Sequence, residues 1–449
     1  MTEIQHVTTL IHARWVLPVL PENNALPEHS VAIHHDKIVA VLPTELARQT
    51  YTADSVLELN DHAVLPGLIN THGHLAMSLF RGLADDLPLM EWLNDHIWPA
   101  EGTWVSEDFV RDGCRLAMAE MIRGGTTTFS DMYFFPEVVA EEAKALGMRG
   151  QLCCPVLDFP TVWGSGADEY IQKTLALIEA HRDSPLLRIG FGPHAPYTVS
   201  DEPLTRIRDL AIEHSVPVQI HLHETRHEVD EAMSKAGTRP VSRLADLGLL
   251  SPAIKLQCVH MTALEERDIE QVKAAGAHVL HCPESNLKLA SGFCPVAKLI
   301  DAGINVALGT DGAASNNDLD MLGEMRTAAL IAKPLANDAS VLSARQALEM
   351  ATINGARALG LEDRTGSLEP CKQADIIAVD LDALNSQPSY DPISDIVYSV
   401  GANQVSHVWI AGKAQLRDSE LLNLDTRKLI EMAKEWAVKI HRTDEANAS

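Results

Sequence analysis

The stretch Leu65-Pro-Gly-Leu-Ile-Asn-Thr-His72-Gly-His74 decides how this chain is to be interpreted. Its first half is an apolar run suited to a β-strand, and its second half places two histidines two residues apart. In an extended segment residues i and i+2 point the same way, so both imidazoles can approach one ion. Gly73 between them has no side chain to obstruct that approach. The stretch therefore predicts a strand that leads into a metal site.

Seven more strand-like runs follow the first, and segments with helical spacing separate many of them. The eight runs cover residues 64–70, 126–131, 149–156, 188–194, 217–223, 255–260, 277–281 and 304–311. The helical segments include 108–123, 136–146, 201–214, 262–274 and 319–331. Eight strands that alternate with helices are typical of a (β/α)8 barrel of the TIM type, which needs about 250 residues. A doubly wound open sheet is less well supported, because no Gly-x-Gly-x-x-Gly motif follows the first strand.

The two ends of the chain resemble each other and differ from the middle. Short strands broken by polar turns are expected at 30–43 and 55–59, and again at 375–380 and 405–416. A helix is expected over 427–440. We therefore expect residues 1–66 plus 367–449 to form one small β-sandwich domain, and residues 67–366 to form the barrel.

Nearly every predicted barrel strand leads into a residue that can bind metal or transfer a proton. These residues are His72, His74, Asp131, His194, His221, His223, His260, His281 and Asp311. The carboxyl ends of barrel strands converge on one face, where active sites are built. One such histidine alone would more often be a hydrogen-bonded rim residue. The repetition over seven of the eight strands favours a site.

The residue types in this set point to a catalytic metal. His221 offers a third imidazole, and Asp311 offers a carboxylate within Gly309-Thr310-Asp311-Gly312. Imidazole nitrogen combined with carboxylate oxygen suits zinc or iron, and no thiolate belongs to the set. Ligands with an open position for water would make the site catalytic rather than structural.

Composition restricts the classes of partner and the compartment. The chain has 449 residues, with 36 Lys+Arg against 62 Asp+Glu and a formal net charge of -26. A surface this acidic repels phosphate groups, so no nucleic acid and no anionic membrane is expected as a partner. Seven cysteines without a Cys-x-x-Cys pair argue against a disulfide framework. Without a secretory signal or a long apolar run, the protein is expected to be cytoplasmic.

Several motifs together resemble the amidohydrolase superfamily over nearly the whole chain. They are the run 65–74, His221-Leu-His-Glu224, Val259-His260 and Leu308-Gly-Thr-Asp311. The segments 78–86, 131–134, 192–197, 281–289 and 312–317 are similar to the group of 5'-methylthioadenosine/S-adenosylhomocysteine deaminases and to the related triazine hydrolases.

The resemblance implies one Zn²⁺ per subunit, on His72, His74, His221 and Asp311, although another divalent metal such as Fe²⁺ would also suit these ligands. Two-metal members use a modified lysine at the end of the fourth strand. This strand ends in Gly192-Pro-His194 and has no lysine there, which favours one metal.

The resemblance also implies hydrolytic deamination of an adenine nucleoside. Zinc lowers the pKa of water toward neutrality. Glu224 would take the water proton and pass it to N1 of adenine, and His260 and Asp311 would orient the hydroxide and collect its second proton. Ammonia would then leave C6. As an alternative, Glu224 is a first-turn carboxylate that the helix dipole favours.

Further residues are expected to hold the nucleoside. By the resemblance, Glu101 accepts hydrogen bonds from the ribose hydroxyls, and His194 bonds the purine or the sugar. Trp163 could form an apolar wall, and His281 is expected within the site; for Glu101 and Trp163 the alternatives are a surface carboxylate and core packing. Relatives that favour S-adenosylhomocysteine carry arginines after the third strand, and residues 153–167 contain none. We therefore expect a neutral substrate, 5'-methylthioadenosine or adenosine.

Other functions remain open at this point. A triazine or guanine-type amidohydrolase could use the same barrel, and a non-catalytic scaffold would predict gaps in the ligand set. Nucleoside and water are the expected small-molecule partners. Homo-oligomers are common in the family, and one chain does not reveal an interface.

Overall fold

A computed structural model describes residues 4–447, with side chains described as far as residue 441. The chain divides into two compact units, each built from separated segments. The first contains residues up to Asn70, 120–128 and 320–424, and the second contains 71–119, 129–319 and the segment after 424. The predicted domain boundaries at residues 66 and 367 remain a prediction.

The two ends of the chain form one eight-stranded sheet, as expected from their similar patterns. Its strand order is β16-β15-β14-β13-β4-β1-β2-β3. The strands are β1 (Gln5–Val16), β2 (Leu26–His34), β3 (Lys37–Pro43), β4 (Tyr51–Pro66), β13 (Ile376–Asp380), β14 (Val405–Ile410), β15 (Lys413–Arg417) and β16 (Glu420–Leu421).

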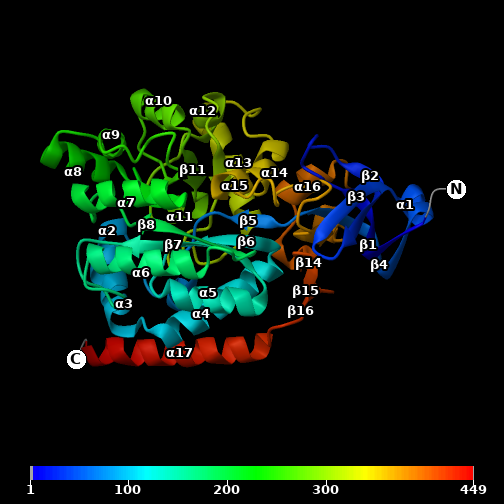
Figure 1. The fold of residues 1–449 in the computed structure, drawn as a ribbon, viewed down its shortest axis with the longest axis horizontal. Coiled ribbons are helices and arrows are strands. Elements are labelled where there is room, and N and C mark those ends of the chain that lie inside the picture. Colours follow the sequence, from blue (N-terminus) through cyan, green and yellow to red (C-terminus); the bar gives the residue numbers. More distant parts are fainter. Residues whose placement is uncertain (1–3, 448–449) are drawn as a thin grey trace. The chain divides into compact units, whose positions relative to one another are not determined.

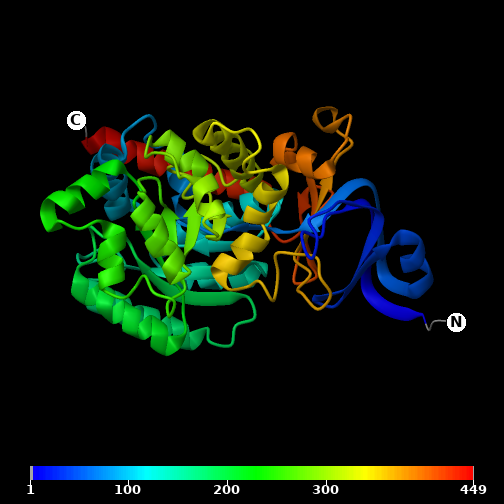
Figure 2. The same ribbon diagram turned by 90° about the horizontal axis from the view of Figure 1, so that it is seen from above.

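Antiparallel pairing of β4 with β13 joins the N-terminal half of this sheet to the C-terminal half, with Val64 opposite Ala378. Figures 1 and 2 show the blue N-terminal strands beside the orange C-terminal ones. Ile11, Val31 and Ile376 are fully buried in the core of this β-domain. Burial of such side chains is the main source of its stability.

The second sheet is the predicted barrel, with eight strands in the sequential order β5 to β12. The strands are β5 (Leu68–Asn70), β6 (Thr126–Asp131), β7 (Arg149–Val156), β8 (Leu187–Pro193), β9 (Val218–Leu222), β10 (Leu256–His260), β11 (His278–His281) and β12 (Val306–Leu308). The pairs from β7 to β12 are parallel, which confirms the (β/α)8 interpretation.

Helices follow the strands and cover the outside of the sheet (Figure 1). They are α4 (Glu107–Arg123), α5 (Pro136–Leu146), α6 (Ala167–Ala180), α7 (Asp201–His214), α8 (Arg226–Ala236), α9 (Pro240–Asp246), α10 (Glu266–Ala275), α11 (Pro283–Lys288), α12 (Val296–Asp301) and α13 (Met321–Ala336). Helix α10 begins four residues after the predicted start. The N–H groups of Thr262 and Ala263 bond to the carbonyl of His223 instead, and Glu265 caps the helix.

The remaining helices lie outside this alternation. The segment after β5 contains short turns and helices, namely a 3₁₀ turn (Leu75–Phe80), α2 (Leu89–Glu91), a π-helix (Trp92–Ile97) and α3 (Trp98–Trp104). The others are α1 (Thr44–Thr50), α14 (Ala344–Met350), α15 (Ile353–Leu359), α16 (Pro392–Tyr398) and α17 (Thr426–Asn447).

Helix α17 belongs to the same compact unit as the metal-ligand candidates. Trp436 is nearly buried, its indole N–H donates to Asp112 at 2.8 Å, and its ring meets the edge of Phe109. No helix within residues 4–447 combines the length and the apolar character needed to cross a lipid bilayer.

Candidate active site

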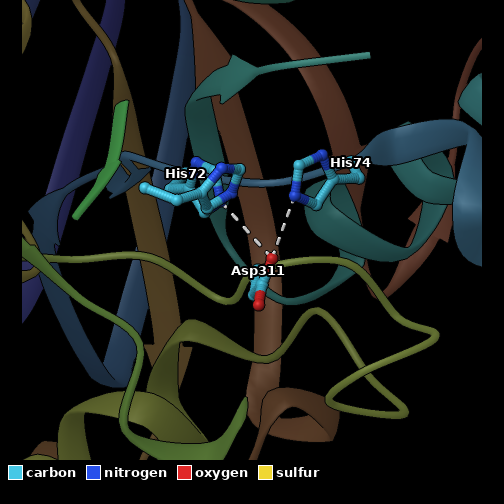
Figure 3. Close-up of side chains that lie close together, drawn as sticks. His72, His74 and Asp311 are labelled. Atoms are coloured by element: carbon cyan, nitrogen blue, oxygen red, sulfur yellow. Dashed lines mark hydrogen bonds and ion pairs between the residues drawn. The ribbon is translucent and has the colours of Figure 1, made fainter. Parts of the chain in front are cut away.

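The ends of three barrel strands bring four metal-ligand candidates together. His72, His74, His221 and Asp311 each offer one ligand atom, and all four atoms lie within 4.8 Å of one another. The Nε2 atoms of His72 and His74 lie 3.4 and 3.1 Å from Oδ1 of Asp311 (Figure 3). Three imidazoles with one carboxylate are a donor set that zinc prefers. The residues present therefore fit the metal that the sequence predicts.

The three histidines are held so that the same ring nitrogen of each faces the others. The Nδ1 atom of His72 bonds to Oε1 of Gln219 at 2.7 Å, and that of His74 bonds to the carbonyl of Met132 at 2.6 Å. His221 bonds in the same way to the carbonyl of His194 at 2.7 Å. Because these oxygens only accept, each Nδ1 carries a proton, and Nε2 is the ring nitrogen that faces the other ligand candidates. This is the ring orientation that binding of a metal through Nε2 needs.

Each of the two carboxylate oxygens of Asp311 has its own contacts, which fix the orientation of the side chain. Its Oδ2 accepts the hydroxyls of Ser285 at 2.7 Å and Ser315 at 3.0 Å, while its Oδ1 faces the histidines. Burial raises the pKa of Asp311, but the hydrogen bonds from His72 and His74 outweigh that effect and hold it well below its usual range. The same carboxylate outweighs burial at His74 and raises the pKa of that imidazole to about 9. Asp311 therefore presents a full negative charge to a cation.

The backbone segments that follow β5 and β12, the first and last barrel strands, lie in direct contact. The N–H groups of Thr71 and Asp311 donate to the carbonyls of Leu308 and His72, both at 3.0 Å. A Cβ at Gly309 would lie 2.8 Å from the nitrogen of His72, so this approach requires glycine. Asp311 has a φ of 62°, a strained value that surrounding contacts must maintain and that is common at functional sites.

A cavity opens over the metal ligands, and its wall carries the predicted proton-transfer residue. Glu224 is 7% exposed, and burial, with the charge of Asp311 as the next cause, raises its pKa to about 8. The Nε2 atom of His260 lies 3.8 Å from the Glu224 carboxylate, and its Nδ1 donates to Asn286 at 2.9 Å. Glu224 can therefore hold a proton near neutral pH, beside a histidine whose free nitrogen faces it.

Two predicted substrate contacts line the same cavity. Glu101 comes from α3, and burial raises its pKa to about 7 against the opposing effects of Tyr133 and His74. His194 follows β8, where burial lowers its pKa to about 4, so its ring is neutral at neutral pH. Beyond these groups the wall is largely apolar and aromatic. No lysine or arginine occurs among the lining residues that the structure describes.

Besides His72 and His223, three predicted strand-end or pocket residues lie outside the lining of this cavity. Asp131 accepts the N–H of Leu75 at 2.7 Å and so fixes the turn after His74. Trp163 stacks on Tyr170 and donates to Glu137, which is the core-packing alternative. His281 is buried, and neither ring nitrogen has a hydrogen-bond partner. A direct substrate contact for Trp163 or His281 remains a prediction.

The sequence analysis missed the residues that support the ligands. Gln219 beneath His72, and Ser285 and Ser315 beside Asp311, are not distinguishable from other buried polar residues by spacing. The only available signal for Gln219 is its position two residues before His221 in the same strand, which places both side chains on one face of β9.

Comparisons with known proteins agree with this geometry. Residues 63–414 match the model of the amidohydrolase family. The chain is 52% identical over 440 residues to a 5-methylthioadenosine/S-adenosylhomocysteine deaminase of Saccharophagus degradans, with 98% of each chain covered.

Solved structures show the same fold. An adenosine deaminase from Xanthomonas campestris with bound zinc is 48% identical, with a TM-score of 0.96 and coverage of 98% of this chain and 100% of that one. An atrazine chlorohydrolase from Arthrobacter aurescens has a TM-score of 0.89 at 24% identity, covers 96% of this chain and 100% of its own, and shows the fold alone. With its ligand quartet at the strand ends and this match across most of its length, the chain belongs to the amidohydrolase family.

Proposed function

We propose that the protein is a zinc-dependent deaminase that converts the 6-amino group of an adenine nucleoside to a 6-oxo group and releases ammonia. One observation carries the proposal: a fitting zinc donor set, the proton-holding Glu224 and the carboxyl of Glu101 face the same cavity. The names of the Saccharophagus and Xanthomonas relatives support this reaction.

The chemistry requires water to attack C6 and the C6–N bond to break. A divalent metal bound by His72, His74, His221 and Asp311 would supply hydroxide near neutral pH. Glu224 takes a proton from water and donates it to the ring nitrogen next to C6, which makes C6 more electrophilic. Because its pKa is raised to about 8, the ionised form of Glu224 is a stronger base than an exposed carboxylate, so it can take that proton and hold it until the ring nitrogen accepts it.

His260 is placed to receive the second proton. Its Nδ1 donates to Asn286, so its Nε2 is free to accept on the side that faces Glu224. Burial lowers the pKa of His260, so the ring is available in its neutral, accepting form. Delivery of this proton to the departing nitrogen would release ammonia.

Glu101 would recognise the sugar. Its two carboxylate oxygens can accept from the 2'- and 3'-hydroxyls of ribose, which are paired donors. A triazine has no diol, so a carboxyl that lines the cavity favours a nucleoside over the triazine alternative.

The lining favours a substrate without a charged tail. The cavity wall includes Met77, Leu89, Trp92, Leu93 and Ile97, and the described lining contains no lysine or arginine. An amino-acid carboxylate placed there would lose hydration without gaining a partner. We therefore expect 5'-methylthioadenosine and adenosine to be preferred over S-adenosylhomocysteine.

We also propose that the protein is cytoplasmic and that it binds neither nucleic acid nor membranes. All seven cysteines are free thiols, which suits a reducing compartment. The net charge of -26 disfavours polyanions.

The test is turnover by metal-loaded protein, followed by the change in adenine absorbance and by ammonia release. Adenosine, 5'-methylthioadenosine and S-adenosylhomocysteine are compared, with guanine and a chlorotriazine as competing substrates. We expect turnover of the first two with kcat/KM at least about tenfold above that of S-adenosylhomocysteine, since the missing partner is worth more than about 1.4 kcal/mol. Comparable values for all three nucleosides would refute the preference, and turnover of guanine or the triazine alone would replace the proposed reaction.

A further inference from the structure

A second buried glutamate holds the turn that carries Glu224. Glu228 lies in the first turn of α8, is 8% exposed, and is absent from the lining of the cavity. Its Oε1 accepts the backbone N–H of His223 at 3.0 Å, and its Oε2 accepts that of Glu224 at 2.8 Å. Both oxygens of one carboxyl therefore bind two successive residues of the loop after β9.

The turn itself is strained and fixed on several sides. His223 has a φ of 51°, a left-handed value that a residue with a side chain rarely adopts. Its ring is fully buried, bonds through Nδ1 to the carbonyl of Ala263 at 3.0 Å, and accepts the N–H of Val241 at 3.2 Å. Thr262 donates its hydroxyl to the carbonyl of Glu224 at 2.7 Å. The backbone on both sides of the Glu224 side chain is thus bound.

Without the Glu228 carboxyl, the backbone N–H groups of His223 and Glu224 would lose the acceptor that holds them. Burial raises the pKa of Glu228 to about 8, while the N–H groups of Glu224 and His223 act in the opposite direction. The buried carboxyl and the strained turn therefore depend on each other, because either would be left with unsatisfied polar groups if the other were absent. The side chain of Thr225, the N-cap of α8, also accepts the N–H of Glu228 and fixes where the helix begins.

We propose that Glu228 is a positioning residue for the deamination, which holds the Glu224 carboxyl in place through the backbone of residues 223 and 224. This inference rests on the proposed function of Glu224. Glu228 does not line the cavity, so it acts through the turn and not by contact with the substrate.

The experiment uses the full-length, metal-loaded protein and the variant Glu228→Gln. Glutamine has the same length, but its amide NH₂ would face one of the two backbone N–H donors, so one of the two bonds is lost. We expect kcat for 5'-methylthioadenosine to fall by about 10- to 100-fold, because a misplacement near 1 Å costs about that much. We expect KM to change by less than about threefold, and zinc content to stay unchanged.

A double-mutant cycle separates positioning from a general structural role. In a Glu224→Gln background the group to be positioned has lost its function, so adding Glu228→Gln should lower the residual rate by less than about threefold. Asp230→Asn, an exposed carboxylate of the same helix in an ion pair with Arg226, is the matched control and should retain wild-type kcat. Glu228→Asp keeps the carboxyl on a shorter side chain and replaces Glu228→Gln if that variant does not fold.

Three results would overturn the inference: a Glu228→Gln variant with wild-type kcat, an effect seen wholly in KM, or an equal loss of rate in the Glu224→Gln background. Hydrogen exchange of the 223 and 224 amides provides a readout without turnover, since both should lose protection in Glu228→Gln and keep it in Asp230→Asn. If the wild-type protein turns over no adenine nucleoside, the proposed function fails, while the exchange result still decides whether Glu228 holds the turn.

Discussion

Replacing Gln219 with leucine tests how the protein prepares its metal site. The Gln219 amide oxygen accepts from Nδ1 of His72 at 2.7 Å, and its amide nitrogen donates to Thr71, Ser130 and Gln257 at 2.7 to 3.2 Å. Leucine fills similar space but removes the Gln219 oxygen that accepts from the Nδ1–H of His72, whose side chain is fully buried.

The size of the effect follows from that lost bond. An unsatisfied buried donor costs about 1–3 kcal/mol. If this cost falls on the tautomer that binds metal, zinc affinity weakens by about 5- to 150-fold, at about 1.4 kcal/mol per factor of ten. Loss of such a supporting contact typically weakens metal binding by about 10- to 100-fold, which is the same range.

The assay is competition between apo-protein and a zinc chelator of known affinity at neutral pH, with the free energy of unfolding measured in parallel. Gln151→Leu is the control, because Gln151 lies in the same buried network and its described amide N–H bonds go to Gln257 at 2.8 Å, Ser130 and Cys153, which are not metal-ligand candidates. It should lose stability but keep zinc affinity within about threefold of wild type. Equal zinc affinity of Gln219→Leu and wild type, or equal weakening by both variants, would refute the reasoning.

Three further outcomes follow from the structure. Glu224→Gln should keep one zinc per chain and lose about 10²- to 10⁴-fold in kcat, as measured by steady-state kinetics and metal analysis, because proton transfer is lost. Near-wild-type activity would remove Glu224 from the mechanism. Since the pKa of Glu101 is raised to about 7, its carboxyl becomes protonated as the pH falls below that value and can no longer accept from both ribose hydroxyls. KM for adenosine should therefore rise toward acid pH, and this dependence should be absent in Glu101→Gln. Trp436→Phe should lower the free energy of unfolding, measured by urea titration, by about 1 kcal/mol, because the bond to Asp112 is lost. Trp436→Ala should lower it by about 3–5 kcal/mol, because the packing of the ring is lost as well. A smaller loss for the alanine variant than for the phenylalanine variant would contradict the packing of α17.

The barrel could be predicted from the sequence because its signals are local. The predicted strands 126–131 and 149–156 and the helices 136–146 and 201–214 coincide with β6, β7, α5 and α7. Short apolar runs between amphipathic helices specify these elements without reference to distant residues. The metal ligands were predictable for a related reason, since the carboxyl ends of the strands meet on one face in this topology.

Other parts of the structure depend on contacts between residues far apart in the chain. Gln219 meets His72 across 147 positions, and Ser285 meets Asp311 across 26. The position of a residue at a strand end also does not reveal whether its side chain faces the cavity or supports the backbone elsewhere. Asp131 bonds the backbone of Leu75 and His281 lies outside the cavity lining, although both end strands as predicted. The π-helix at 92–97 and the seven-residue helices α14, α15 and α16 are too short for periodicity to reveal.

A zinc titration of apo-protein, with 5'-methylthioadenosine as the substrate, shows whether this chain is a deaminase that uses one zinc ion. We expect chelated protein to be inactive, and deamination to rise in proportion to added zinc. The plateau should come at one zinc per chain, with one ammonia released for each nucleoside converted. Full activity without metal, a plateau at two ions per chain, or protein that binds zinc at this stoichiometry and deaminates no adenine nucleoside would contradict this expectation.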